Sequence, residues 1–168
     1  MKLFHGSYTK VDNPTVNAGR RNLDFGVGFY VTNLRSQAEK WALVVGGRHN
    51  NNDEGVVNEY DFDECVFDQC KVLKFPVYDI AWLDFVVANR SGKDLAKGYD
   101  IVEGGVANDQ VIDTVEDYET GRITANQALD QLRYKKPNHQ LCIRSQEILD
   151  KYLHFTSCYI FKDEDLNK

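Results

Sequence analysis

Apolar and β-branched residues along this chain fall into short runs separated by polar or glycine-containing stretches. Runs of this length and composition are typical of β-strands. They predict seven strands, at residues 3–7, 25–32, 56–62, 70–75, 99–106, 139–144 and 155–161. Between them lie segments in which apolar residues recur every three or four positions, the spacing of amphipathic helices.

Five such segments predict helices. The first begins at Ser36, because Ser36 and Glu39 have the spacing of a capping box, and it ends at the following pair of glycines. Its apolar spacing turns Trp41 towards the interior. The others are expected at 79–89, from an Asn108–Asp109 cap to Gly121, from Thr124 towards Pro137, and after a Ser145 cap.

The order of these elements favours a mixed fold. Strands cluster at both ends and in the middle of the chain, so an α+β fold with a split, largely antiparallel sheet and flanking helices fits better than a regular βαβ alternation. The chain has 168 residues, and neither an internal repeat nor a low-complexity tract divides it. We therefore expect a single domain over residues 1–168.

Charge and hydropathy exclude several classes of protein. The chain carries 20 Lys and Arg against 26 Asp and Glu, a net charge of −6, which argues against a protein that coats nucleic acid through a general basic surface. No run approaches the ~20 apolar residues that span a bilayer, and the first residues do not form a signal peptide. We expect a cytoplasmic protein with no membrane partner.

The four cysteines predict neither zinc binding nor export. Cys65, Cys70, Cys142 and Cys158 form no C-x-x-C pair, and no His lies at ligand spacing from them. We expect reduced thiols and no metal, with Cys142 and Cys158 facing the core from strands.

The segment at 25–32 is the most specific part of the pattern. In a strand, one face would carry only apolar side chains, and the other would carry Gly26, Gly28, Tyr30 and Thr32. Glycines inside a strand suit a place where a ligand or another backbone approaches closely. Two interpretations stay open at this point, a pocket wall and a bulged strand packed under a helix.

The first strand ends in His5 followed by Gly6. A histidine at a strand end is more often structural than functional. Here Gly6 would let a flat polar ligand reach the backbone, and His5 would be placed to form a hydrogen bond with a sugar hydroxyl.

These motifs together resemble the ADP-ribosyltransferase superfamily, in the branch with a His–Tyr–[Glu/Asp/Gln] signature that includes the poly(ADP-ribose) polymerases. The whole chain is similar to a bacterial ADP-ribosyltransferase-like family of unknown function. The matching segments are Leu3-Phe4-His5-Gly6-Ser7, Asp24-Phe25-Gly26-x-Gly28-Phe29-Tyr30-x-Thr32, Gln37-Ala38-x-x-Trp41-Ala42, Trp82-Leu83-x-Phe85, Asn89-Arg90, Tyr99-Asp100-Ile101-Val102, Gly105-Val106-Ala107-Asn108-Asp109 and His139-Gln140-Leu141.

The resemblance implies that NAD binds as co-substrate in a cleft of a split sheet. His5 would contact the adenosine ribose, the backbone of Gly6 would pair with the nicotinamide carboxamide, and Tyr30 would stack on the nicotinamide ring. Trp41 stands where the polymerase branch has a second stacking tyrosine. Ser7 and Gly28 belong to the same binding motifs. The serine that holds the carboxamide in that branch is replaced by Ala38, so Ser36 or Gln37 would supply the contact.

The third signature position falls on Gln140. In the family a glutamate there binds the nicotinamide-ribose hydroxyl and stabilises the cationic state as nicotinamide leaves. Gln140 can accept that hydrogen bond, but it has no charge and cannot act as a base. The alternative is a strand residue that pairs with backbone. Along this strand, Cys142 and Arg144 would share the face of Gln140, and His139, Leu141 and Ile143 the other.

Several charged residues have two interpretations. The basic pairs Arg20–Arg21 and Lys135–Lys136 are either solvated or face the NAD pyrophosphate and the acceptor substrate, respectively. Asn108 and Asp109 either cap a helix or position the acceptor. Asp24 is either a turn residue or a contact near the first basic pair.

The expected function is mono-ADP-ribosylation of a macromolecular acceptor, a protein or a nucleic acid. The resemblance and the small size suggest an intracellular bacterial toxin with an antitoxin protein as partner. Two alternatives remain: an NAD glycohydrolase, and a binding module for NAD or ADP-ribose that has lost turnover through Gln140 and Ala38.

Overall fold

The computed structural model describes residues 1–19, 22–50, 53–108 and 111–167. Its strands are β1 (Lys2–Ser7), β2 (Phe29–Val31), β3 (Glu54–Phe62), β4 (Val72–Phe75), β5 (Ile101–Gly104), β6 (Gln140–Ile143) and β7 (Leu153–Lys162). Its α-helices are α1 (Arg35–Asn50), α2 (Ile80–Arg90), α3 (Ile112–Glu119), α4 (Ala125–Leu132) and α5 (Gln146–Tyr152), and short 3-10 helices cover Glu64–Asp68 and Asp163–Asn167. The α+β class is confirmed.

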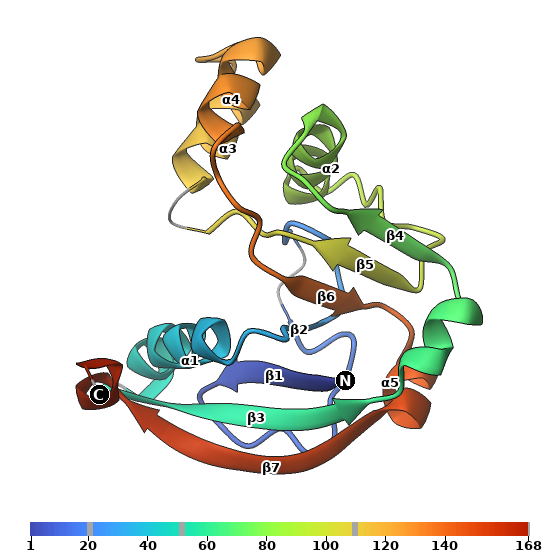
Figure 1. Cartoon of the computed structure of the whole chain (residues 1–168), viewed down its shortest axis with the longest axis vertical. Helices are drawn as coiled ribbons and strands as arrows, with labels where there is room; N and C mark the ends of the chain where they lie inside the picture. Colours follow the sequence, from blue (N-terminus) through green and yellow to red (C-terminus); the bar gives the residue numbers. More distant parts are fainter. Residues whose placement is uncertain (20–21, 51–52, 109–110, 168) are drawn as a thin grey trace.

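The strands form two sheets that diverge from each other (Figure 1). One sheet has the order β1-β3-β7 and is antiparallel throughout. The other has the order β2-β6-β5-β4, in which β4 and β5 run parallel. The expectation of a largely antiparallel arrangement therefore holds except for this pair, whose connection contains α2.

Three buried clusters hold the layers together. One joins α2, α3 and α4 to a face of the four-stranded sheet and contains Trp82 and Cys142. A second joins residues of both sheets and α5, including Leu3 and Leu141. The third packs Ala38 and Ala42 of α1 against the other face of the three-stranded sheet. The removal of this apolar surface from water stabilises the fold, at roughly 25 cal/mol per Å².

Helix α1 differs from the prediction at both ends. It begins at Arg35, and Glu39 forms an ion pair with Arg35 at 3.0 Å. It continues through Gly46–Gly47 to Asn50. A side chain at Gly46 would approach the carbonyl of Glu54 too closely. Glycine at 46 thus permits contact between the helix and β3. The expected stop at these glycines is wrong.

The predicted strand at 25–32 is also shorter than expected. Only Phe29–Val31 forms β2, and the residues before it form a turn with Gly26 at φ +75°. Phe29 and Val31 share one apolar cluster, but Phe25 belongs to the opposite one. A positive φ favours glycine, so the turn accounts for Gly26 without a ligand.

The remaining elements were predicted closely. Asp79, Thr124 and Ser145 cap α2, α4 and α5 through their side chains, and the capping box at Thr124 is complete. Helix α3 starts later than expected, with Val111 at its N-cap position and no side-chain cap.

The four cysteines are free thiols in different environments. Cys142 is buried, as predicted, whereas Cys158 is exposed on β7 and its expected core position is wrong. Burial raises the pKa of the Cys142 thiol to about 12. Within the described residues, no helix is both long and apolar enough to cross a membrane.

Candidate functional site

The candidate site lies where β1 and β2 meet. A single bridge joins the two strands, with Phe4 and Thr32 exchanging both backbone hydrogen bonds at 2.8 and 2.9 Å. Next to it, the imidazole of His5 reaches the backbone carbonyl of Tyr30. Within the described parts of the chain, this bridge is the only strand pairing that joins the two sheets.

His5 is held by its neighbours in one hydrogen-bonding state. Its Nδ1 lies 2.7 Å from the carbonyl oxygen of Tyr30, and its ring contacts Phe29 with centroids 4.5 Å apart. A carbonyl only accepts, so Nδ1 carries the proton and Nε2 of the neutral ring is an acceptor. Burial lowers the pKa of His5 below its usual value, which favours the neutral ring.

The side-chain position of Gly6 and its backbone groups face different surroundings. A side chain at this position would come within 2.3 Å of the carbonyl oxygen of Ala38 in α1, so helix packing requires the glycine. The side-chain space of Gly6 is therefore filled by α1. Its backbone is different, because residues two apart in a strand point their N–H and C=O groups the same way. Since Phe4 directs these groups to Thr32, Gly6 directs its own towards β2 as well.

Tyr30 holds the turn that precedes β2. Its hydroxyl donates to the carbonyl of Gly26 at 2.5 Å and accepts from the N–H of Phe25 at 3.2 Å. Its ring stacks against Phe25 with centroids 6.4 Å apart, and burial raises the pKa of its hydroxyl. The hydroxyl of Tyr30 is therefore already hydrogen-bonded within the protein, and its ring is already in contact with Phe25.

Gly28 does not form an open floor. A side chain there would come within 2.5 Å of the Cys142 sulfur and 2.8 Å of the Ile143 carbonyl oxygen. The glycine permits close packing on β6. The space beside Gly28 is filled by β6, so neither the bare pocket wall nor a bulged strand packed under a helix describes this segment.

Gln140 begins β6 and lies near the bridge. Tyr30 pairs with Cys142 and Val31 with Leu141, so Thr32 and Gln140 are neighbours one step further along the strands. The predicted alternation is confirmed, because Cys142 packs in the cluster that also contacts Tyr30, and Leu141 and Ile143 pack in the other. Gln140, partly exposed, therefore shares a face with Tyr30 and Thr32.

Trp41 is not an inward residue. The side chains of α1 that pack against the sheet are Ala38 and Ala42, while Trp41 is 51% exposed and lies 5.8 Å from the guanidinium of Arg48. The predicted inward orientation is wrong, because Ala38 and Ala42 make the close approach to Gly6 and leave Trp41 on another side of the helix. Ser36 is exposed and Gln37 is partly buried on the same helix.

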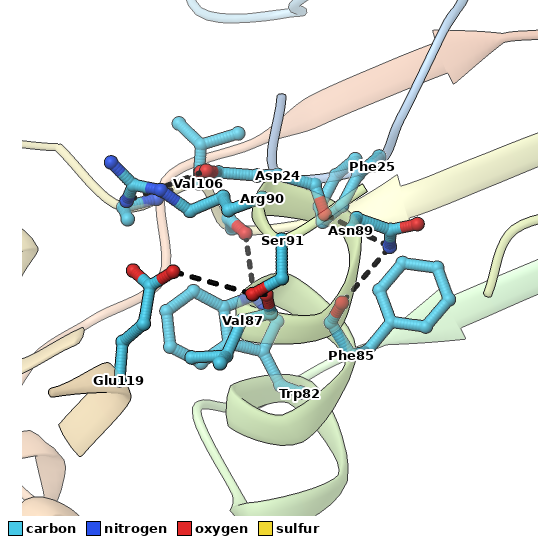
Figure 2. A network of polar contacts seen from close by, with 12 residues as sticks. Asp24, Phe25, Trp82, Phe85, Val87, Asn89, Arg90, Ser91, Val106 and Glu119 are labelled. Atoms are coloured by element: carbon cyan, nitrogen blue, oxygen red, sulfur yellow. Dashed lines mark hydrogen bonds and ion pairs between the residues drawn. The ribbon is translucent and has the colours of Figure 1, made fainter. Parts of the chain in front are cut away.

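Asp24 connects the Tyr30 turn to the loop after β5, a connection that Figure 2 shows. Its carboxylate accepts the N–H of Ala107 at 2.7 Å and lies 3.8 Å from Arg90, and its carbonyl accepts from Asn89 at 3.2 Å. Burial raises the pKa of Asp24, although the N–H of Ala107 and the charge of Arg90 oppose the shift. The pattern that signals this network is Asn89-Arg90 at the end of α2.

The same loop is held from other sides. Trp82 Nε1 donates to the carbonyl of Gly105 at 2.8 Å, and Asn138 accepts the N–H of Val106 at 2.7 Å. The loop that leads to Asn108 is thus fixed at several successive backbone groups. Sequence reasoning did not identify Asn138 in this role.

A buried amide in β3 was also missed. Asn58 lies opposite His5 in the sheet and is fully buried. Its side chain accepts the N–H of Val11 at 2.8 Å and donates to the carbonyl of Thr9 at 3.2 Å. It fixes the chain that leaves β1, where Ser7 is also buried and accepts from the N–H of Thr9 at 3.4 Å. The signal in the sequence is an Asn that directly follows Val56 and Val57 within a predicted strand.

A second group of polar residues surrounds a cavity of about 300 Å³ at the ends of β4 and β5. Glu103 contacts Lys74 at 2.8 Å and His139 at 3.4 Å, and His139 accepts the N–H of Asn33 at 3.1 Å. These partners lower the pKa of Glu103 to about 2. Neither this cavity nor one of about 450 Å³ at the end of β7 is lined by His5, Tyr30 or Gln140.

The predicted acceptor residues are exposed outside helices and strands or lie outside the described residues. Lys135 and Lys136 are exposed in the loop after α4. The backbone carbonyl of Asn108 accepts from the N–H groups of Val111 and Ile112, both at 2.9 Å. Arg20, Arg21 and Asp109 lie outside the described residues. Among the residues described, no group of three or more His, Cys, Asp or Glu side chains is arranged to hold a metal ion.

Fold and site define an α+β protein in which two sheets meet at a bridge flanked by His5, Tyr30 and Gln140. The chain belongs to the family described as "Protein of unknown function (DUF3990)", whose model matches residues 1–155. Comparison with curated proteins and with solved structures gives no match.

Proposed function

We propose that this protein is a mono-ADP-ribosyltransferase of the ADP-ribosyltransferase fold, which binds NAD where β1 and β2 diverge and cleaves the nicotinamide–ribose bond. One observation carries the proposal. The three signature positions, His5, Tyr30 and Gln140, are far apart in sequence but gather on three neighbouring strands around one backbone bridge.

The state of His5 supports contact with a ribose. Its Nε2 is an acceptor because Nδ1 donates to the Tyr30 carbonyl. Such an atom selects a ligand group that donates, and a sugar hydroxyl is one. The lowered pKa of His5 keeps the ring neutral near pH 7, so it would not bind a phosphate through charge.

The backbone of Gly6 supports contact with a carboxamide. A peptide N–H and C=O that point the same way match the carbonyl oxygen and amino group of an amide. Ala38 and Ala42 bring α1 against Gly6, and the exposed Trp41 adjoins Ala42 on that helix. The proposal assigns the exposed Trp41 as a stacking partner of the ring that Gly6 holds.

The chemistry required of Gln140 is modest. As the bond between ribose C1 and the nicotinamide nitrogen breaks, its electron pair leaves with neutral nicotinamide, and the ribose gains positive charge. The acceptor nucleophile then forms the new bond to C1 and loses its proton to solvent or to a group of its own. Gln140 stabilises the ribose through a hydrogen bond to a hydroxyl but cannot take that proton.

A second candidate is NAD glycohydrolysis, in which water is the acceptor and the same hydrogen bond with Gln140 is required. Weaker electrostatic stabilisation also fits a binding module without turnover. The proposal includes the role of an intracellular toxin that modifies a macromolecule and is restrained by an antitoxin protein.

The test is incubation of the purified protein with NAD labelled in the adenine and nicotinamide parts, with and without a bacterial lysate. We expect release of nicotinamide and labelled macromolecules. His5→Ala should bind NAD about tenfold more weakly, the value of one hydrogen bond, and His49→Ala, at an exposed position, is the matched control. No NAD binding by the parent protein would contradict the proposal.

Gln140→Glu separates the candidates. A gain of NAD cleavage in this variant would indicate an enzyme weakened by Gln140. Loss of cleavage would indicate that the neutral amide belongs to the working site. Free ADP-ribose without labelled macromolecules would favour the glycohydrolase.

A further inference from the structure

Strand β7 forms the outer edge of the three-stranded sheet (Figure 1). It is ten residues long and pairs on one side with β3, while no strand in the described part of the chain pairs with its other side. It lies two strands away from β1 and therefore from the candidate site.

The direction of its backbone groups follows from one contact. The N–H of Asp163 donates to the carbonyl of Asp53 at 3.0 Å, so odd-numbered residues before it point towards β3. Cys158 and Ile160 therefore direct their N–H and C=O groups outwards. The N–H of Lys162, which also points outwards, donates to the side chain of Asp165 at 3.1 Å.

This edge carries few of the features that protect edges. A bulge interrupts the register between Glu59 and Tyr60, opposite Thr156. Beyond it, residues 157–161 contain no proline and no charge, and Ile160 is 59% exposed. An unpaired strand of this composition is a template for another strand.

Acidic residues at the end of β7 determine which charge a bound segment should carry there. The cavity of about 450 Å³ there is lined by Asp53, Glu54, Lys162, Asp163 and Glu164, which together carry four carboxylates and one ammonium. A segment that continues along β7 into this cavity meets negative charge. It would therefore be favoured by Lys or Arg at that end.

We propose that the free edge of β7 binds an extended segment of a partner protein, which adds a strand to the sheet. The partner forms backbone hydrogen bonds with Cys158 and Ile160, places an apolar side chain beside Ile160 and directs a Lys or Arg into the acidic cavity. Strand addition obtains affinity from the main chain and specificity from such side-chain positions. This site is separate from the proposed NAD site.

The experiment uses amide exchange by NMR on the full chain at millimolar peptide concentration. The probe is an acetylated peptide Thr-Val-Thr-Val-Thr-Val-Lys-Arg, and its control ends in Glu-Glu. We expect the basic peptide to slow exchange at Cys158 and Ile160 and to bind about threefold more tightly than its control, the effect of an exposed ion pair.

Two variants make the test specific. Ile160→Pro removes an outward N–H that forms no hydrogen bond with β3, and this variant should not bind the peptide. Ile160→Thr keeps the N–H and should bind. Protected amides at Tyr159 and Phe161 show that the sheet is intact. Asp163→Asn combined with Glu164→Gln should remove the preference for the basic peptide.

Three results would overturn the proposal. These are unchanged exchange at Cys158 and Ile160 with both peptides, equal binding by Ile160→Pro, and equal affinity for the two peptides. Sedimentation that shows a dimer through β7, with these amides protected only at high protein concentration, would assign the edge to a second copy of the chain.

Discussion

His5 and Gly6 offer complementary hydrogen-bonding groups at adjacent positions. The imidazole presents an acceptor at Nε2, fixed by the bond from Nδ1 to the Tyr30 carbonyl, and the Gly6 peptide presents a donor and an acceptor together. A hydroxyl and a carboxamide would satisfy these groups in one ligand. This match does not depend on charge, which suits a chain with a net charge of −6.

The ion pairs of Glu103 predict a pH dependence of stability. Its pKa is about 2 in the folded protein and near 4.5 without its partners. Because the folded-state value is lower, Glu103 stabilises the protein above about pH 4.5, and this contribution is lost as the pH falls towards 2. Lys74 is largely exposed, so we expect less than about 1 kcal/mol.

Thermal unfolding of Glu103→Gln across pH 2–7 tests this prediction. The variant should be less stable than the parent at pH 7, and the difference should shrink as the pH falls below about 4.5. Glu116→Gln, at an exposed position, should show no such convergence. A pH-independent difference between parent and Glu103→Gln would contradict the assignment.

At the scale of elements, the sequence predicts what local signals determine. The caps at Asp79, Thr124 and Ser145 act within a few residues, so they identify the starts of α2, α4 and α5. All seven strands were located for a similar reason, because each contains a short run rich in apolar, aromatic or β-branched residues.

The errors arise where long-range packing decides. From the sequence alone, Gly6 and Gly28 indicated close approach of a ligand, and Gly46 indicated the end of a helix. In the structure, backbone or a side chain of another element occupies the space beside each of them. The same packing uses Ala38 and Ala42 as the inner face of α1 and leaves Trp41 exposed. The gathering of His5, Tyr30 and Gln140 depends on strand pairing, which the sequence alone did not provide.

Asn58 provides a test of how β3 holds the segment after β1. Asn58→Leu removes the acceptor for the N–H of Val11 and the donor to Thr9, and it should lower the free energy of unfolding by about 1–3 kcal/mol. Urea unfolding measures the loss, and amide exchange should accelerate at Val11. Asn13→Ala, at an exposed position, serves as control. Equal stability of Asn58→Leu and the parent would contradict this role.

For the whole molecule, the two proposed surfaces lie on opposite edges of the three-stranded sheet. β1 carries the His5 edge and β7 the free edge, with β3 between them. A strand added to β7 leaves the groups of Gly6 uncovered. A partner bound at β7 and NAD bound at the bridge should therefore not compete.

The proposed toxin activity is a property of the whole chain and can be tested in cells. Induced expression in a bacterial host should slow growth, because transfer of ADP-ribose inactivates a target and consumes NAD. His5→Ala should restore growth at equal protein level, since it loses the contact proposed for the ribose, whereas His49→Ala should remain inhibitory. Growth curves, immunoblots and NAD assays of the same cultures measure these outcomes. Equal inhibition by the parent and His5→Ala would separate toxicity from the NAD site, and unimpeded growth with active parent protein would contradict the toxin role alone.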